Sequence, residues 1–235
     1  MTVDLVVQVA MDEEAQPFRD LADSASNSVL VGGNTHQELV FGGQTIALIV
    51  SGIGFVNAAH AATLAIARYG AEVPLISAGT AGGLSAETRV GDVIISTDLI
   101  NLEADARAFG YALGQVPGMP ALYRGDEALA AKLLAGDHGQ PARLGGIGSG
   151  EKFVTADLAA ELRVNFPTLD AVDMESVAIA QVAHKYGTRF VSVRAISDLC
   201  APDGDEFLTH LDGAAQNVAK LIHEIVSLNK LKLAE

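Results

Sequence analysis

Two apolar runs near the C-terminal end of the chain, each followed by an acidic residue, constrain its fold more than any other feature. Residues 169–173 and 190–196 are short and largely apolar, a pattern that predicts two β-strands. Glu175 lies where the first run gives way to a helix, and Asp198 lies just beyond the second run. A strand–helix–strand unit of this kind is typical of an open α/β sheet, in which ligands bind at the carboxyl ends of the strands. We therefore expect Glu175 and Asp198 to lie at one edge of the sheet and to hold one small ligand between them.

The rest of the chain shows the same mixture of apolar runs and helical patterns. We expect further strands at residues 5–10, 29–31, 37–41, 45–50, 73–78, 90–100 and 142–147. We expect helices at residues 11–21, 56–69, 127–135, 157–166 and 205–231, the last with a long apolar stripe that begins at Leu208. No linker or internal repeat separates these segments, so residues 1–235 are predicted to form a single α/β domain.

The charge balance restricts the partners of the chain. Its 15 Lys and Arg residues and 29 Asp and Glu residues give a formal net charge of −14. A surface of this charge repels phosphate backbones, which argues against nucleic-acid binding, and it also disfavours a free anionic co-substrate. The six histidines show no metal-ligand spacing, so no metal site is expected.

The N-terminal segment and the cysteine content favour a cytoplasmic location. The first apolar run, of only about six residues, is preceded by Asp4, which fits neither a signal peptide nor a membrane span. Cys200 is the one cysteine, which excludes an internal disulfide and makes an oxidising compartment unnecessary. We therefore expect a cytoplasmic protein without membrane contact.

Three glycine-rich turns follow predicted strands. Gly52-Ile53-Gly54 matches part of a dinucleotide-binding fingerprint, but the third glycine is missing. Residues 79–83 include the hydroxyl of Thr80, and residues 148–150 precede Phe153. These turns are either plain connections or places where the backbone approaches a ligand.

Several residues allow both a structural and a functional interpretation. Asp12, Glu13 and Glu14 suit the first turn of a helix, whose dipole favours negative charge, but one of them could also lie in the ligand crevice. Phe153 could stack on a planar ligand or pack in the core. Residues 101–124 are rich in apolar and aromatic side chains without clear periodicity, which indicates a lid or, as we favour, a subunit interface.

Seven motifs, taken together, resemble those of a known family. They are AMDEEAQPF (10–18), SGIGFVNAA (51–59), SAGTAGGL (77–84), VGDVIIST (90–97), AFGYALGQVPGMP (108–120), VDMESVAIAQVAH (172–184) and VRAISD (193–198). In this order and spacing the chain resembles the 5′-methylthioadenosine/S-adenosylhomocysteine nucleosidases of the nucleoside phosphorylase superfamily. The resemblance covers nearly the whole chain and rests on the combination, because any one motif alone would be weak.

The resemblance implies a fold, an activity and three acidic residues that perform it. The fold would be a three-layer αβα sandwich with a central mixed β-sheet, in a protein that is usually a homodimer. The activity would be hydrolysis of the N-glycosidic bond of an adenine thionucleoside to adenine and a thioribose, without a cofactor. Asp198 would be the acid at adenine N7, Glu14 would position and deprotonate the water, and Glu175 would bind the ribose hydroxyls.

The same resemblance implies how the rest of the nucleoside is bound. Phe153 would stack on adenine, and the backbone of Val154 would meet the edge of the ring. Met11 and Met174 would pack on the sugar.

It also implies a set of supporting residues. Thr80, Ser197 and Arg194 would support the water, the acid and the carboxylates. Ile53 and Phe207 would line the pocket for the alkylthio group.

The neighbouring subunit would complete the site, and this chain departs from the family pattern nearby. Phe109 and Pro117 would enter from the second subunit of the dimer. Asp173 stands where the family usually has Glu, which shortens one carboxylate of the substrate site by a methylene. Arg107 replaces a small residue near the entrance of the 5′ pocket, and Phe55 replaces a common Lys. These departures put selectivity at the 5′ group in question, and leave the three acids intact.

The chemistry of nucleoside cleavage explains the need for these acids. Departure of the base leaves positive charge on the ribose, and adenine leaves readily only when N7 is protonated. An acid whose pKa is raised by an apolar site suits Asp198, which lies between Ile196 and Cys200. An ionised Glu14 would activate water and stabilise the ring cation, and an ionised Glu175 would accept hydrogen bonds from two hydroxyls.

Water is favoured over phosphate as the nucleophile. A phosphate dianion needs arginines or a free glycine nest, whereas residues 75–80 offer Ser77 and no arginine. Glu14 would also repel phosphate by roughly 1 to 4 kcal/mol at contact range.

Three other functions are kept as alternatives. The nearest is hydrolysis of another 6-aminopurine nucleoside such as aminofutalosine. The second is a catalytically silent nucleoside sensor, against which the intact Glu14, Glu175 and Asp198 argue. The third is a dinucleotide-dependent oxidoreductase, which rests only on Gly52-Ile53-Gly54.

Overall fold

The computed structural model describes residues 2–136, 141–200 and 205–228. Its strands are β1 (Leu5–Val9), β2 (Ser24–Ala25), β3 (Val29–Val31), β4 (Asn34–Phe41), β5 (Gln44–Val50), β6 (Leu75–Gly83), β7 (Val93–Asn101), β8 (Tyr123–Arg124), β9 (Ala142–Ser149), β10 (Leu169–Asp173) and β11 (Phe190–Asp198). Its helices are α1 (Asp12–Leu21), α2 (Phe55–Tyr69), α3 (Glu127–Leu134), α4 (Ala156–Asn165), α5 (Ser176–Tyr186) and α6 (Asp205–Ser227), with a short 3-10 helix at Arg107–Phe109.

The strands of the described residues form one mixed sheet. Their order is β10-β9-β7-β11-β6-β1-β5-β4-β2, with β3 paired to β4 and β8 paired to β7. β1 is parallel to β5 and β6, and β6 is parallel to β11, so the carboxyl ends of these strands meet at one edge. In addition, β10 pairs with β6 in the antiparallel sense, which closes β6, β11, β7, β9 and β10 into a ring.

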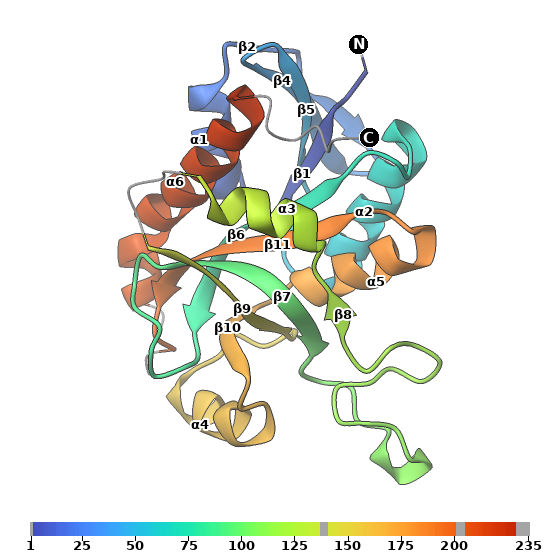
Figure 1. The fold of residues 1–235 in the computed structure, drawn as a ribbon, viewed down its shortest axis with the longest axis vertical. Coiled ribbons are helices and arrows are strands. Elements are labelled where there is room, and N and C mark those ends of the chain that lie inside the picture. The colour runs from blue at the N-terminus through green and yellow to red at the C-terminus, as the bar shows by residue number, and fades with distance from the viewer. Residues whose placement is uncertain (1, 137–140, 201–204, 229–235) are drawn as a thin grey trace.

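Helices cover both faces of the sheet (Figure 1). α1, α3 and α6 pack on one face through a core that includes Phe18, Leu133 and Ile222. α2 and α5 pack on the other face through a core that includes Ala62 and Ile179. The predicted three-layer αβα architecture with a central mixed sheet is therefore confirmed. No helix in the described ranges is long and apolar enough to cross a membrane.

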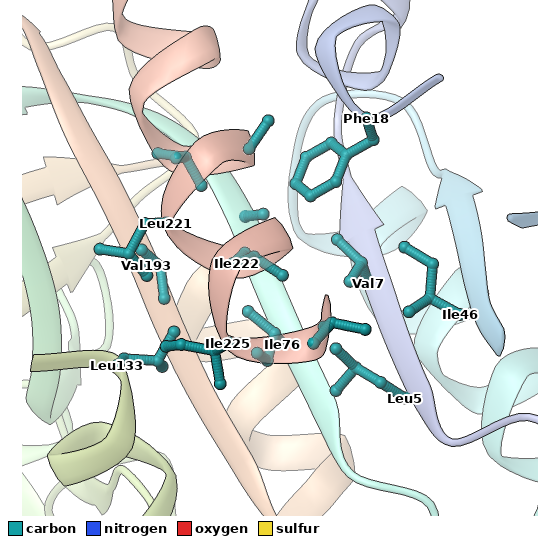
Figure 2. Packing of buried hydrophobic residues seen from close by; sticks show 14 of the residues in the cluster. Leu5, Val7, Phe18, Ile46, Ile76, Leu133, Val193, Leu221, Ile222 and Ile225 are labelled. Atoms are coloured by element: carbon teal, nitrogen blue, oxygen red, sulfur yellow. The ribbon is translucent and has the colours of Figure 1, made fainter. Parts of the chain in front are cut away.

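The larger core forms because the apolar stripe of α6 faces the apolar strands. Figure 2 shows Leu221, Ile222 and Ile225 beside the side chains of the central strands, and each of the three is at most 1% exposed. Burial of one such side chain contributes roughly 1.5–3 kcal/mol. The predicted stripe is confirmed from Ala215 to Ile225, whereas Leu208 at its start and Leu228 at its end are 69% and 55% exposed. The first turn of α6, which carries Leu208, reaches the rim of the cavity described below.

A smaller core fills the ring of five strands. It contains one residue from each strand, namely Ala81, Ile94, Ile147, Ala171 and Ile196. Gly82 and Gly83 of β6 pair with Val172 and Ala171 of β10, and a Cβ atom at Gly82 would lie only 3.2 Å from the Val172 side chain. Glycine in β6 therefore permits the close approach of strands that closes the ring.

The strand directions within this ring show that the predicted βαβ crossover between residues 169 and 198 is wrong. β10 is antiparallel to β6 whereas β11 is parallel to it, so β10 and β11 run in opposite directions. Both Val172 and Asp198 nevertheless pair with Gly82, and this shared partner brings the carboxyl ends of the two strands together.

Most other predicted elements are confirmed, with shifted ends. The strand predicted at residues 73–78 continues to Gly83 because its glycines pair with β10 and β11. The strand predicted from residue 90 begins at Val93, because Asp92 accepts a hydrogen bond from the backbone N–H of Arg89 in a preceding turn. The last residues of the helix predicted to reach residue 231 lie outside the described residues.

Candidate active site

A cavity lies where β1, β6, β10 and β11 end, and it collects most of the residues that the sequence singled out. The described residues that line it are Ala10, Met11, Glu14, Ile53, Thr80, Ala81, Gly82, Lys152, Phe153, Val154, Val172, Asp173, Met174, Glu175, Ser197, Asp198 and Phe207. All three predicted catalytic acids are among them. The structure thus brings together carboxylates that lie up to 184 residues apart, at positions 14 and 198.

Glu14 is held at the cavity wall by four hydrogen bonds. It lies in the first turn of α1 and is 4% exposed. Its Oε2 accepts hydrogen bonds from the backbone N–H groups of Ala10 (3.0 Å) and Met11 (3.2 Å). Its Oε1 accepts hydrogen bonds from the N–H (2.9 Å) and the hydroxyl (3.2 Å) of Thr80. Two of these donors lie just before α1 and two belong to Thr80 of β6, so both oxygens of the carboxyl group are held from two sides.

Gly79 leaves the space that this carboxylate occupies. A Cβ atom at position 79 would lie 2.5 Å from Oε1 of Glu14 and 3.0 Å from its carboxyl carbon. Any side chain at this position would displace Glu14 from its hydrogen bonds. The glycine-rich segment 79–83, which is the end of β6 and not a turn, therefore serves the site through the absence of a side chain.

Asp198 is the last residue of β11 and is 4% exposed. Its Oδ2 accepts a hydrogen bond from the hydroxyl of Ser197 (2.9 Å), and its Oδ1 accepts one from the backbone N–H of Cys200 (2.9 Å). Cys200 adopts a left-handed backbone conformation, with φ of 56°, that non-glycine residues rarely take. Burial, followed by the charge of Asp198, raises the pKa of the Cys200 thiol to about 12, so the thiol stays neutral.

Glu175 lies at the junction of β10 and α5 and is 8% exposed. Its Oε1 accepts a hydrogen bond from the backbone N–H of Gly54 (3.0 Å), and its Oε2 lies 4.0 Å from the guanidinium of Arg194. Burial, and next the nearby carboxylate of Asp173, raise the pKa of Glu175 from 4.5 to about 8. Arg194 lowers this pKa and Glu14 raises it, so the charge of Arg194 does not offset the effects of burial and of the neighbouring acids.

Replacing Glu175 by Gln is expected to stabilise the fold at alkaline pH. In the wild type, the folded state keeps a proton on Glu175 up to about pH 8, whereas the unfolded chain loses it near pH 4.5. The unfolded state thus binds fewer protons between these values, so this group lowers stability as pH rises through them. The stability of Glu175→Gln relative to wild type should therefore grow between pH 4.5 and pH 8.5, by an amount on the order of a few kcal/mol.

Urea unfolding of both proteins at these two pH values measures this gain. Glu161→Gln, which changes an exposed acid on α4, is the matched control and should show no such pH dependence. An equal stability difference between Glu175→Gln and wild type at both pH values would contradict the assignment.

Asp173 lies at the cavity wall, but its oxygens are engaged by the protein itself. Oδ1 accepts a hydrogen bond from the hydroxyl of Ser149 (2.5 Å), and Oδ2 accepts hydrogen bonds from the hydroxyl of Ser176 and from Nε of Arg194 (2.7 Å). Arg194 is 2% exposed and donates a second hydrogen bond to the hydroxyl of Ser77 (2.8 Å). This network fixes Arg194 directly behind the wall that carries Glu175.

The rim of the cavity is aromatic and partly exposed. The rings of Phe153 and Phe207 meet edge to face, with centroids 5.9 Å apart. Phe153 is 46% exposed and Ile53 is 48% exposed, although both line the cavity. The interpretation of Phe153 as a core residue is therefore wrong.

Phe109 and Pro117 lie away from this cavity. Both belong to the segment between β7 and β8, which protrudes from the body of the protein in Figure 1. Phe109 is 83% exposed, and Pro117 is exposed as well.

Several residues of the site were not identified from the sequence. Ser149 and Ser176 hold Asp173, and Lys152 and Val172 line the cavity. Ser149 and Ser176 offered no signal, because serine is common in turns and at helix starts whatever its partner. Within the described part of the chain, no cluster of His, Cys, Asp and Glu residues could hold a metal ion.

Comparison with known proteins identifies the family of the chain. The sequence matches the phosphorylase superfamily over residues 4–227. It is 40% identical over 228 residues to the 5′-methylthioadenosine/S-adenosylhomocysteine nucleosidase of Geobacillus kaustophilus, covering 95% of this chain and 96% of that protein.

Solved structures show the same likeness. The Neisseria meningitidis nucleosidase in complex with methylthio-immucillin-A superposes with a TM-score of 0.88 at 37% identity, covering 95% of this chain and 98% of that one. The Colwellia psychrerythraea nucleosidase in complex with adenine superposes with a TM-score of 0.89 at 30% identity, covering 100% and 99%. The chain therefore belongs to the 5′-methylthioadenosine/S-adenosylhomocysteine nucleosidase family of the phosphorylase superfamily.

Proposed function

We propose that this protein hydrolyses the N-glycosidic bond of 5′-methylthioadenosine and S-adenosylhomocysteine, releasing adenine and the thioribose. The observation that carries the proposal is that Glu14, Glu175 and Asp198 line one cavity. The relative from G. kaustophilus is named for both nucleosides, and the solved relatives hold a methylthio-immucillin or adenine. A nucleoside in this cavity would meet acids from three separate elements.

In the proposed reaction the two acids at opposite ends of the chain have opposite tasks. Asp198 donates a proton to adenine N7 as the bond between C1′ and N9 breaks, so that adenine leaves as a neutral base. Ser197 and Cys200 hold its carboxyl group through one hydrogen bond to each oxygen. The ribose then carries the positive charge of an oxocarbenium-like state. Glu14 accepts a proton from the water that adds to C1′, and its negative charge stabilises the cation meanwhile.

Glu175 binds the sugar in this proposal. Its carboxylate accepts hydrogen bonds from the 2′ and 3′ hydroxyls, while the backbone N–H of Gly54 holds Oε1 in place. Because donors favour the ionised form of a carboxyl group, nucleoside binding lowers the raised pKa of Glu175. Arg194 and Asp173 act behind it as a buried support.

The remaining walls suit the other parts of the nucleoside. Phe153 stacks on adenine, and the backbone of Val154 meets the ring edge. Met11 and Met174 pack on the sugar. All four line the cavity.

Three further residues complete the proposed binding site. Thr80, bonded to Glu14, supports the water. Ile53 and Phe207 form the partly exposed end of the cavity, which suits the alkylthio group.

Turnover is expected to be independent of phosphate. The described lining contains four carboxylates, and its one cation is the exposed Lys152. The guanidinium of Arg194 already donates hydrogen bonds to Asp173 and Ser77, so it cannot bind a phosphate dianion through two parallel N–H groups. The rate of adenine release should therefore be unchanged between zero and 50 mM phosphate at constant ionic strength, to within about twofold. A sugar phosphate product would show that the protein is a phosphorylase.

Adenine release from four nucleosides tests the proposed substrate class. Methylthioadenosine and S-adenosylhomocysteine should be cleaved with a higher kcat/KM than adenosine, because Ile53 and Phe207 would hold an alkylthio group. A preference for aminofutalosine would move the protein to the alternative substrate. Binding of all four without cleavage would identify a nucleoside sensor instead.

We also propose a homodimer in which the protruding segment of one subunit reaches the site of the other. Phe109 is 83% exposed on this protruding segment, which fits an aromatic residue that packs against a second subunit. In a dimer, Phe109 and Pro117 would close the exposed end of the partner's cavity. Sedimentation equilibrium should give twice the chain mass, and Phe109→Ala should raise KM without changing kcat.

A further inference from the structure

Glu151 lies in the turn between β9 and the aromatic rim of the cavity. Its side chain is exposed, and it is not among the described residues that line the cavity. Its Oε1 nevertheless accepts a hydrogen bond from the backbone N–H of Phe55 (2.9 Å), the first residue of α2. Its own N–H donates to the carboxylate of Glu103 (3.0 Å). An exposed acid thus connects three segments that are distant in sequence.

The same helix start also holds Glu175. The N–H of Gly54 donates to Glu175 from the interior of the site, and the next N–H along the chain, that of Phe55, donates to Glu151 from outside. The positive end of the α2 dipole favours both carboxylates. Gly54 has a φ of 96°, and a Cβ atom there would lie 2.7 Å from Oε2 of Glu151. Glycine at position 54 therefore gives Glu151 the room to approach.

Two cavity residues lie close to this contact on either side. Phe153 follows Glu151 by two residues, and Ile53 precedes Phe55 by two residues. Phe153 and Ile53 are 46% and 48% exposed, so packing in the core does not fix either of them. The hydrogen bond between Glu151 and Phe55 directly connects the two turns that carry them.

We propose that Glu151 is a positioning residue for substrate binding. By fastening the turn at residues 149–154 to the start of α2, it sets the separation of Phe153 and Ile53 and hence the fit of the nucleoside between them. This role rests on the proposed nucleosidase activity. Glu151 touches no reacting atom, because it acts through the two walls of the cavity.

Replacing Glu151 by Ala should separate binding from chemistry. Loss of a hydrogen bond to a charged group should raise KM for methylthioadenosine about tenfold. The kcat value should stay within about threefold of wild type, because the three acids keep their own hydrogen bonds. Glu151→Gln keeps the length and one acceptor oxygen, so its KM should stay within about threefold of wild type. Glu161→Ala, which removes an exposed acid of α4, is the control and should leave both constants unchanged.

Amide hydrogen exchange at Phe55 provides a readout that needs no turnover. Exchange should be faster in Glu151→Ala than in wild type, and Glu151→Gln should restore protection. An unchanged KM in Glu151→Ala, an equal loss in Glu151→Gln, or a fall in kcat as large as the rise in KM would overturn the assignment. If the wild-type protein released no adenine, the proposed function would be wrong. If Glu151→Ala left the exchange rate at Phe55 unchanged, the proposed attachment of the 149–154 turn to α2 by Glu151 would be wrong.

Discussion

The Asp198→Asn protein should bind methylthioadenosine but cleave it about 10³-fold more slowly than wild type. The asparagine amide occupies the same volume and can donate a hydrogen bond to adenine N7, but it has no proton to transfer. Adenine would then have to leave as an anion, which is the step that acid catalysis avoids. Calorimetric binding of methylthioadenosine together with single-turnover release of adenine separates these two effects, and the dissociation constant should change by less than about fivefold.

A nucleoside with a better leaving group makes this test sharper. If Asp198 supplies a proton, its replacement should slow cleavage much less for a base that departs readily as an anion. Asp212→Asn, which changes an exposed acid of α6, should behave as wild type with either substrate. An equal loss of rate for good and poor leaving groups would show that Asp198 holds the substrate and does not protonate it.

Replacing Glu14 by Gln should lower kcat by 10² to 10⁴, roughly the range that a general base contributes. The same replacement should also lower stability, because of the hydrogen bonds that Glu14 accepts. The carboxylate accepts from Ala10 and Met11 on one oxygen and from Thr80 on the other, whereas glutamine has only one acceptor oxygen. One pair of donors would then face an amide N–H group, so the variant should also lose about 1–3 kcal/mol of stability.

Thermal unfolding and single-turnover kinetics, measured on the same preparation, distinguish the two effects. Glu13→Gln is the matched control, because its side chain is exposed on the same turn of α1 and should affect neither quantity. A Glu14→Gln protein that is less stable but cleaves at the wild-type rate would mean that another group activates the water.

Local patterns were sufficient to predict most of the secondary structure and the residue types of the site. The apolar stripe of α6, the apolar run of β1, the acids after β1 and the acid at the end of β11 can be read from the sequence, because they depend on spacing within one element. The resemblance to a known family then indicated which of these acids belong to the active site. These predictions required no knowledge of which strand pairs with which.

Supporting contacts of the site could not be predicted in the same way. The bonds from Ser149 and Ser176 to Asp173, and from Glu151 to Phe55, join residues whose local sequence is that of ordinary turns and helix starts. A short hydroxyl or an exposed acid has no periodicity that reports its partner. Only a structure with both segments in place identifies them.

The sequence by itself determined that acidic residues would stand at the ends of apolar strands, because strand and helix periods are properties of adjacent residues. The tertiary structure alone decided that β10 runs opposite to β11 and that Val172 and Asp198 share Gly82 as a partner. That arrangement depends on side-chain size at contacts across the ring, where glycines in β6 allow β10 to approach. Strand pairing depends on contacts between residues that are distant in sequence. It brings Glu175 and Asp198 into one cavity, although the predicted crossover is absent.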